Sequence, residues 1–290
     1  MFNKLEKPIV QKYHDNNWEF INPKSIDNEE VSTLFWNAVD YIDSNSLLTE
    51  KILKRLIAEH PYYIDAYIHL SIAFRTQGKD FESLLVAEKA FKLGIGCLPE
   101  TFDLKKDKIA WLNINNRPFL KSCQNFGLEC HYHKKYSEAA EIYKLNLDLN
   151  EEDHQGIRYL LLETLFAAEE YKKAEELLHQ HADDFSIEFK FGTVVIHILI
   201  GNFEQADKHL KEAIRTNIFF IDEVIKSKHV KPLPYRIAGE PNFDAGIPTR
   251  SIQEAYDYWK RNEALYKHKK IIAYFKTAQK KLQKTFESIL

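Results

Sequence analysis

The sequence predicts an all-α protein built from repeated pairs of helices. Two observations favour this fold class. Glycine and proline each occur 9 times in 290 residues, too rarely for the many turns of a β-sandwich or for long disordered linkers. In addition, four segments share one pattern of apolar, aromatic and small residues, and a pattern that recurs at this length is typical of stacked helical units.

The repeated pattern places a small residue near the start of the second helix of each pair, where it lets the first helix approach closely. These small residues are Ser83, Ala139, Ala174 and Ala206. The last two steps between them are 35 and 32 residues long, whereas the first step is 56 residues. A regular helix pair of about 34 residues therefore repeats, and roughly 22 extra residues are inserted between the first two copies.

These segments resemble tetratricopeptide repeats, although Cys123, Arg158 and Lys190 stand where that family has a tryptophan. The resemblance implies a right-handed superhelical solenoid of helix pairs, closed by a C-terminal capping helix segment. Three further phrases, at residues 115–120, 153–161 and 251–260, resemble a group of bacterial repeat proteins related to the suppressor-of-tumorigenicity-7 family. That narrower resemblance implies a fold and no established activity.

The composition divides the chain into four expected parts. Prolines and scattered polar residues predict an extended or poorly ordered arm over residues 1–25. The repeats occupy residues 26–217, with an insertion at about 94–118. Four prolines then predict an irregular connection over residues 218–250, and amphipathic stripes predict capping helices over residues 251–290.

Charge and hydropathy exclude several classes of function. The formal net charge is −3, from 40 Lys and Arg against 43 Asp and Glu, so the chain as a whole has no basic field to attract nucleic acid. No apolar run reaches the ~20 residues of a membrane helix, and no apolar core of a signal peptide begins the chain. Three cysteines fit a reducing compartment. We expect a cytoplasmic protein without nucleic acid partners.

The sequence shows no motif typical of an enzyme, since it has no phosphate-binding loop, nucleophile elbow or zinc-protease signature. The best metal candidates are Cys123, Cys130, His131 and His133. The two cysteines share a helical face, but they also fall on positions that the repeat buries, where cysteine packs as a small apolar residue. We expect no metal, no cofactor and no catalytic residue.

The first helix of each pair is expected to line the inner curve of the solenoid and to bind a peptide. Aromatic and arginine side chains are the residue types that dominate binding surfaces. The positions expected to face this groove are Arg75, Lys121, Gln124, Asn125, His131, Tyr132, Tyr159, Glu163, Phe166 and Phe191. The alternative for each is that it packs against a neighbouring helix.

Two functions remain open on the sequence. The first is a non-enzymatic scaffold whose concave groove binds a peptide or protein segment. The second is a helical enzyme or regulatory protein, including a secreted bacterial factor, which would use residues 218–250 as a lid over His131, Glu163 and His197.

The C-terminal region is basic, since residues 260–284 hold nine Lys and Arg against one acid. This basic helix either caps the solenoid or binds an anionic membrane or a partner groove.

Overall fold

The structure is a computed structural model that describes residues 6–233 and 246–287. The chain divides into two compact units, Met1–Thr164 and Leu165–Leu290. Helices form nearly all the regular structure of the described residues, together with one two-stranded sheet. The all-α prediction is therefore confirmed.

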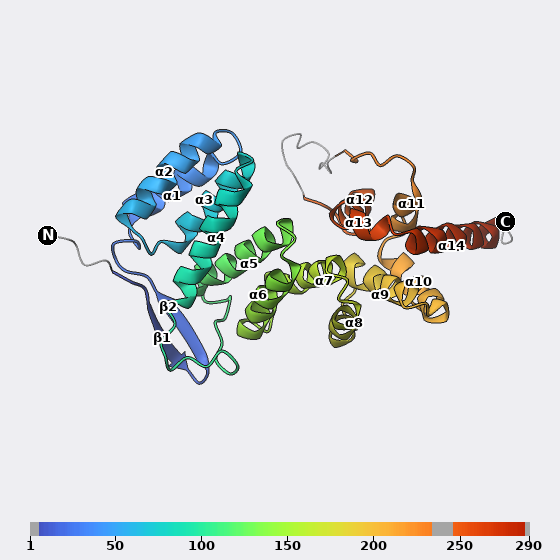
Figure 1. The fold of residues 1–290 in the computed structure, drawn as a ribbon, viewed down its shortest axis with the longest axis horizontal. Helices are drawn as coiled ribbons and strands as arrows, with labels where there is room; N and C mark the ends of the chain where they lie inside the picture. Colours follow the sequence, from blue (N-terminus) through green and yellow to red (C-terminus); the bar gives the residue numbers. More distant parts are fainter. Residues whose placement is uncertain (1–5, 234–245, 288–290) are drawn as a thin grey trace. The chain divides into compact units, whose positions relative to one another are not determined.

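Helices of the first unit follow one another as antiparallel pairs (Figure 1). The pairs are α1 (Glu29–Asp40) with α2 (Ser46–Glu59), α3 (Ile64–Thr76) with α4 (Asp80–Ile95), and α5 (Arg117–Tyr132) with α6 (Tyr136–Leu149). Helix α7 (Ile157–Ala167) begins in this unit. The side chains of Asn28 and Asn45 cap α1 and α2 by accepting hydrogen bonds from the backbone N–H groups of Val31 and Leu48.

Small residues bring the two helices of a pair together, as the repeat pattern predicts. Ser83 and Ala139 are fully buried, and the Ser83 hydroxyl lies 3.1 Å from the hydroxyl of Ser71 on the facing helix. Gly127 makes a closer approach, because a Cβ atom at this position would lie 2.4 Å from the ring of Tyr143 on α6. The α5–α6 contact therefore requires a residue without a side chain at position 127.

The expected arm at residues 1–25 is instead a β-hairpin in its described part. Strands β1 (Ile9–His14) and β2 (Asn17–Ile21) pair antiparallel, with Val10 opposite Phe20. Val10, Trp18 and Phe20 are buried. The alternation of apolar and polar residues was present in the sequence, but the surface that covers the apolar side lies about 90 residues further along the chain.

That covering surface is the insertion between α4 and α5, which includes the short 3-10 helix η1 (Ile114–Asn116). The ring of Trp18 packs edge-on against Phe102 of the insertion, and Phe20 packs against Phe119 in the first turn of α5. The fully buried amide of Asn116 accepts a hydrogen bond from the Phe20 N–H and donates one to the Trp18 carbonyl. Hairpin and insertion thus fold as one substructure, and each buries the apolar side of the other.

The second unit continues the pattern and ends in additional helices. Its elements are α8 (Tyr171–Gln180), α9 (Ile187–Leu199), α10 (Phe203–Thr216), α11 (Phe220–Ile225), α12 (Ile252–Arg261), α13 (Glu263–Tyr266) and α14 (Lys269–Glu287). The small residues Ala174 and Ala206 are fully buried at the start of α8 and α10. The helical period thus extends through both units.

The expected irregular connection at 218–250 is partly helical, because α11 occupies its first residues. Phe220 is fully buried, and its ring lies 4.5 Å from Phe191 and 4.9 Å from both Tyr258 and Tyr266, measured between ring centroids. The prolines that suggested a loop all follow this helix. The residues of α11 contain no proline, and burial of Phe220 among these aromatic rings stabilises the helix there. Residues 234–245 of the expected connection lie outside the described residues.

Gly127→Ala is expected to destabilise the first unit by about 1–3 kcal/mol, because the new methyl group overpacks the α5–α6 contact. The expected change in the free energy of unfolding has the opposite sign from the usual one, since replacing glycine by alanine in an uncrowded helix stabilises the helix by roughly 1 kcal/mol. Urea denaturation followed by circular dichroism measures the difference. A variant as stable as the original chain, or more stable, would contradict the close packing on Tyr143.

Candidate functional site

Helices α3 and α5 lie parallel and in register in the first unit. Three side-chain contacts establish this: Lys121 Nζ lies 3.8 Å from Asp65 Oδ1, Asn125 Nδ2 donates to Ser71 Oγ at 3.2 Å, and Arg75 Nε donates to Glu129 Oε1 at 3.2 Å. Each contact joins residues 54 to 56 positions apart. This offset agrees with the 56-residue step of the repeat, so equivalent positions of the two helices stand side by side.

One surface stripe of each helix borders this contact. Residues seven and eleven positions apart return to the same helical face. The two stripes and the arginine that joins them form what we call the α3–α5 face, which consists of Asp65, Ile72, Arg75 and Thr76 from α3 with Lys121, Gln124, Leu128 and Tyr132 from α5. Ile72 is 38% exposed and Tyr132 is 58% exposed. Apolar side chains at its centre and aromatic and charged groups at its ends make this surface suited to a protein segment.

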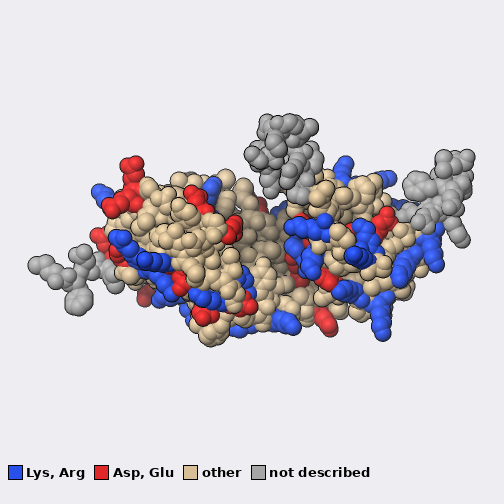
Figure 2. All heavy atoms as spheres, turned by 90° about the horizontal axis from the view of Figure 1, so that it is seen from above, with Lys and Arg blue, Asp and Glu red and all other residues tan. Residues whose placement is uncertain are grey.

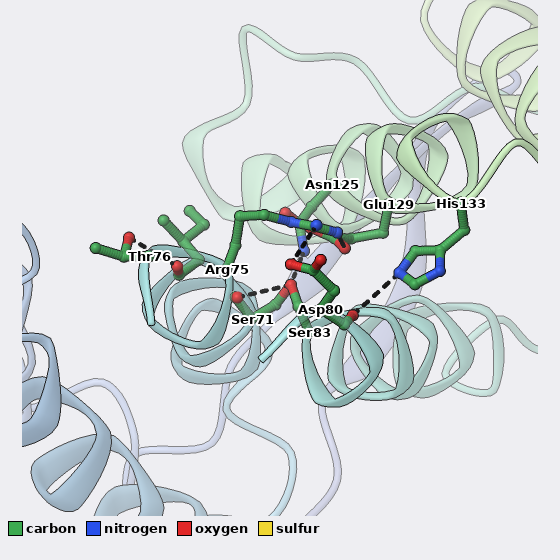
Figure 3. Close-up of polar contacts among 9 residues, drawn as sticks. Ser71, Arg75, Thr76, Asp80, Ser83, Asn125, Glu129 and His133 are labelled. Atoms are coloured by element: carbon green, nitrogen blue, oxygen red, sulfur yellow. Dashed lines mark hydrogen bonds and ion pairs between the residues drawn. The ribbon is translucent and has the colours of Figure 1, made fainter. Parts of the chain in front are cut away.

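An arginine–carboxylate pair fixes one end of the α3–α5 face. Arg75 makes two hydrogen bonds to Glu129, whose side chain is only 4% exposed, and a third to Asp80 at 2.7 Å (Figure 3). The guanidinium also lies over the ring of Tyr132, 4.9 Å from its centroid. A bidentate contact holds the guanidinium in one plane. Arg75 therefore fixes the ring of Tyr132 while it neutralises a buried carboxylate.

A chain of buried hydrogen bonds supports the centre. The Ser83 hydroxyl lies within hydrogen-bond distance of the Ser71 carbonyl and hydroxyl, and Asn125 donates to the same Ser71 hydroxyl (Figure 3). Ser71, Ser83 and Asn125 are all buried. Because each polar group has a partner in this small network, α3, α4 and α5 are held in one arrangement.

The other end of the face carries an ionisable group that is costly to bury. Burial raises the pKa of the Asp65 carboxyl, although Lys121 and His69 act in the opposite direction. Burial likewise lowers the pKa of His69, whose Nδ1 lies 2.9 Å from the Asp65 carbonyl oxygen. Both shifts disfavour the charged form of the group concerned. Two ionisable side chains, Asp65 and His69, thus lie at a partly buried end of the face.

The next helix in the first unit continues this register. His131 shares a hydrogen bond of 2.8 Å with the Thr164 hydroxyl on α7, and Gln155 Nε2 donates to Gln124 Oε1 at 3.0 Å. These pairs are 33 and 31 residues apart, close to the regular repeat. Burial lowers the pKa of His131, against the attraction of Glu163. The α5–α7 junction is therefore a second contact between successive first helices.

The structure brings together part of the residue set predicted from the sequence. Arg75, Lys121, Gln124 and Tyr132 lie on the α3–α5 face, and His131 lies at its edge toward α7. Tyr159 and Glu163 are half-buried on α7, where Arg158 covers the ring of Tyr159 at 4.3 Å.

Three of the predicted contact residues are buried, so the prediction that they line a groove is wrong. Asn125 is buried because its amide completes the network to Ser71. Phe166 is 4% exposed and packs in the core. Phe191 is fully buried and packs on Phe220 and Phe275. Phe166 and Phe191 belong to the second unit, outside the unit that holds the face. An aromatic residue at this phase of the repeat fills the helix seam instead of facing solvent.

The sequence reasoning missed four members of the face, which are Asp65, Ile72, Thr76 and Leu128. The repeat carries a signal for two of them, because a shift by the 56-residue step relates the predicted Lys121 to Asp65 and the predicted Tyr132 to Thr76. Applying this step to each chosen position, instead of choosing positions by residue type, would have identified Asp65 and Thr76. The same step relates Ile72 to Leu128, but neither of these two was a chosen position.

Two cysteines, Cys123 and Cys130, are fully buried on α5. Burial raises the pKa of the Cys123 thiol, and burial together with Glu138 raises that of Cys130 to about 12, so both cysteines stay as unreactive thiols. Within residues 6–233 and 246–287, no group of three or more His, Cys, Asp and Glu residues could hold a metal ion. The described helices include none with the length and apolar character needed to cross a membrane.

Comparison with known proteins gives the family. The family model described as transcriptional repressor TCF25 matches residues 18–289. The chain belongs to the TCF25 family. None of the curated proteins compared with this family member matches it. The narrower likeness to the suppressor-of-tumorigenicity-7 group, and with it a bacterial source, stays a prediction.

Solved structures give the fold. A Podospora anserina protein described as a putative kinesin light chain with nearly identical TPR-like repeats is 14% identical, with a TM-score of 0.50 over 64% of this chain and 94% of its own. A tetratricopeptide repeat protein from Parabacteroides merdae is 17% identical, with a TM-score of 0.47 over 63% and 65%. The match to the Podospora anserina repeats confirms the predicted tetratricopeptide-like fold for this member of the TCF25 family.

Arg75→Met is expected to destabilise the first unit by about 3 kcal/mol at neutral pH, because it leaves the Glu129 carboxylate buried without its cation. The double variant Arg75→Met/Glu129→Met should recover much of this loss, since it removes the buried charge as well. Urea denaturation of the single and double variants forms a double-mutant cycle. Additive effects of the two substitutions would show that the pair does not interact.

Asp65→Asn is expected to make the fold more stable than the original chain at pH 7. Because burial raises the folded-state pKa of Asp65, its protonated form contributes stability below the unfolded pKa of about 3.9, and this contribution is lost as the pH rises through the folded value. The gain from Asp65→Asn should therefore shrink toward zero as the pH falls below about 4.

Thermal denaturation at a series of pH values measures this difference. Asp148→Asn is the control, since Asp148 is an exposed aspartate on α6. It should leave the stability unchanged across the series. A less stable Asp65→Asn protein at pH 7 would mean that the ion pair with Lys121 outweighs burial.

Proposed function

We propose that this TCF25-family chain is a non-enzymatic scaffold that binds a peptide or protein segment on the α3–α5 face. The observation that carries the proposal is the parallel register of α3 and α5, which combines exposed Ile72 and Tyr132 with fixed charged groups on one surface. Partly exposed aromatic and apolar side chains beside immobilised arginine are what binding hot spots use.

The energetics of the face support the same proposal. The Asp65 carboxyl is held where burial disfavours its charged form. The charge of Arg75 is neutralised by the buried carboxylate of Glu129. Natural proteins commonly accept a loss of stability at a binding site, because the groups that meet a ligand are not the groups that pack best. Polar groups in these positions fit recognition better than they fit the core.

The fold and the family description point in the same direction. Stacked helix pairs present extended surfaces to other chains, and the family is described as a transcriptional repressor. We infer a regulatory role exerted through protein contacts in the cytoplasm. The enzyme alternative drew on His131, Glu163 and His197; the structure describes His131 with Thr164 and His197 stacked on His209, which gives catalysis no support.

Peptides selected by this protein from a random display library test the proposal. The double variant Ile72→Asp/Tyr132→Ala should bind the selected peptides at least about ten-fold more weakly, because it removes two partly exposed contact residues while the core is unchanged. Fluorescence anisotropy with synthetic copies of the peptides measures the dissociation constants.

Phe81→Ala is the matched control, since Phe81 is 64% exposed on α4 and lies outside the face. It should leave peptide binding unchanged. Peptides whose binding is lost in Phe81→Ala and retained in the double variant would assign the docking surface to the second helices of the pairs and refute the proposal.

A further inference from the structure

The surface of α14 in the second unit is rich in lysine. Residues 264–281 contain six lysines and no Asp or Glu. Figure 2 shows more Lys and Arg than Asp and Glu over the part of the molecule that holds α12 to α14. This local excess contrasts with the net charge of −3 for the whole chain. A local excess of positive charge therefore lies on α14 and the residues just before it.

Packing fixes which side of α14 faces outward. Ile271, Phe275 and Ala278 are buried on one side, where Phe275 packs against Phe191 and Tyr266. Lys269 and Lys280, with Lys276 between them, lie on the opposite, exposed side. Helix geometry spaces the three lysines about 10 Å and then about 6 Å apart along the axis. They form a straight line of positive charge on a helix that is anchored by its other face.

These charges lack carboxylate partners within the described part of the chain. No Asp or Glu oxygen among those residues lies within 4.0 Å of Lys269, Lys270, Lys276 or Lys280. Nearby basic residues are paired, since Lys260 and Lys267 both contact Glu263. Like charges on one helix repel each other. A capping helix needs a polar outer face, but a mixture of both signs would serve that purpose without the repulsion.

A groove lies beside the lysines, between α10 and α14. Its volume is about 420 Å³, and its lining includes Phe203 and Asp207 from α10 and Lys270, Tyr274, Thr277 and Lys281 from α14. The rings of Phe203 and Tyr274 are stacked, with an interplanar angle of 17°. Phe203 is half exposed. The groove thus offers an aromatic wall with an ammonium group on either side.

We propose that the α14 lysines and this groove form a second docking surface, which binds an acidic protein segment that carries one aromatic or apolar anchor residue. The anchor contacts Phe203 and Tyr274, while carboxylates on either side of it meet the lysines. Charge complementarity of this kind gives specificity and fast association. The surface belongs to the second unit and is independent of the α3–α5 face.

Two other anionic partners fit the observations less well. A membrane-bound amphipathic helix inserts its apolar face, but Ile271, Phe275 and Ala278 of α14 are already buried in the core. A nucleic acid is bound through its phosphates, and arginine suits phosphate because its planar fork donates two hydrogen bonds at once. The exposed basic residues of α14 are lysines, which lack that fork.

Fluorescence anisotropy with a defined probe tests the proposal. The probe is a short fluorescein-labelled peptide of Glu and Asp with one central Phe, and its partner probe has Ala in place of Phe. The full chain should bind the Phe peptide more tightly, and both affinities should fall as salt is added. Lys269→Gln/Lys276→Gln/Lys280→Gln should weaken binding of both peptides at least about ten-fold at low salt.

The matched control is Lys51→Gln/Lys89→Gln/Lys144→Gln, which removes the same charge from three exposed lysines of the first unit and should bind as the original chain does. Phe203→Ala should abolish the preference for Phe over Ala while the α14 lysines still act. Circular dichroism confirms that each variant is folded.

The proposal is overturned if neither peptide binds, or if the two triple variants lose affinity equally. It is also overturned if a single-stranded oligonucleotide or phosphatidylserine vesicles of matched charge displace the peptide at lower concentration than the unlabelled peptide does.

Discussion

The α3–α5 face depends on a buried ion pair that can form in one register alone. Glu129 is almost fully buried, and Arg75 reaches it with two hydrogen bonds from the neighbouring first helix. A slip of α3 along α5 by one turn would leave a buried carboxylate without a cation, which costs several kcal/mol. The same guanidinium holds the ring of Tyr132. Register and surface chemistry are thus set by one side chain.

Small residues make that register possible. Gly127 allows α6 to approach α5 until a Cβ atom would enter the ring of Tyr143, and Ser71 and Ser83 approach within hydrogen-bond distance across the α3–α4 pair. Close pairs position successive first helices beside each other, and polar contacts between those helices then fix the register. The surface of the first unit follows from this order of constraints, because side chains on aligned stripes form one continuous face.

The helix pairs and the register of α3 on α5 could be predicted from the sequence, because the spacing of the small residues gives the repeat period. The 56-residue step between Ser83 and Ala139 is the offset at which Asp65 meets Lys121. What escaped prediction depends on distant partners. The hairpin around Trp18 is buried by Phe102 and Asn116, and α11 is held by Phe220 within an aromatic cluster drawn from α9, α12 and α13. The aromatic character of Phe166 also gave a wrong prediction, because this side chain is buried in the core instead of facing a groove.

The two surfaces differ in chemistry in a way that suits a scaffold. The α3–α5 face has exposed apolar residues between charged groups that are already paired within the fold. The α14 surface has lysines without carboxylate partners in the described chain, beside an aromatic groove. The first favours burial of apolar area, and the second favours charge complementarity sensitive to salt. A member of the TCF25 family with both surfaces could hold two chemically different segments at once.

Site-specific photo-crosslinking tests the central claim most directly. With benzoylphenylalanine placed at Ile72 on the α3–α5 face, irradiation in a native extract should give discrete crosslinked protein bands. The same group placed at Phe81, which is more exposed, should give none of these bands. The account predicts that unlabelled display-selected peptide removes the Ile72 crosslinks. Crosslinks of equal yield at both positions, or crosslinks at Phe81 alone, would contradict it.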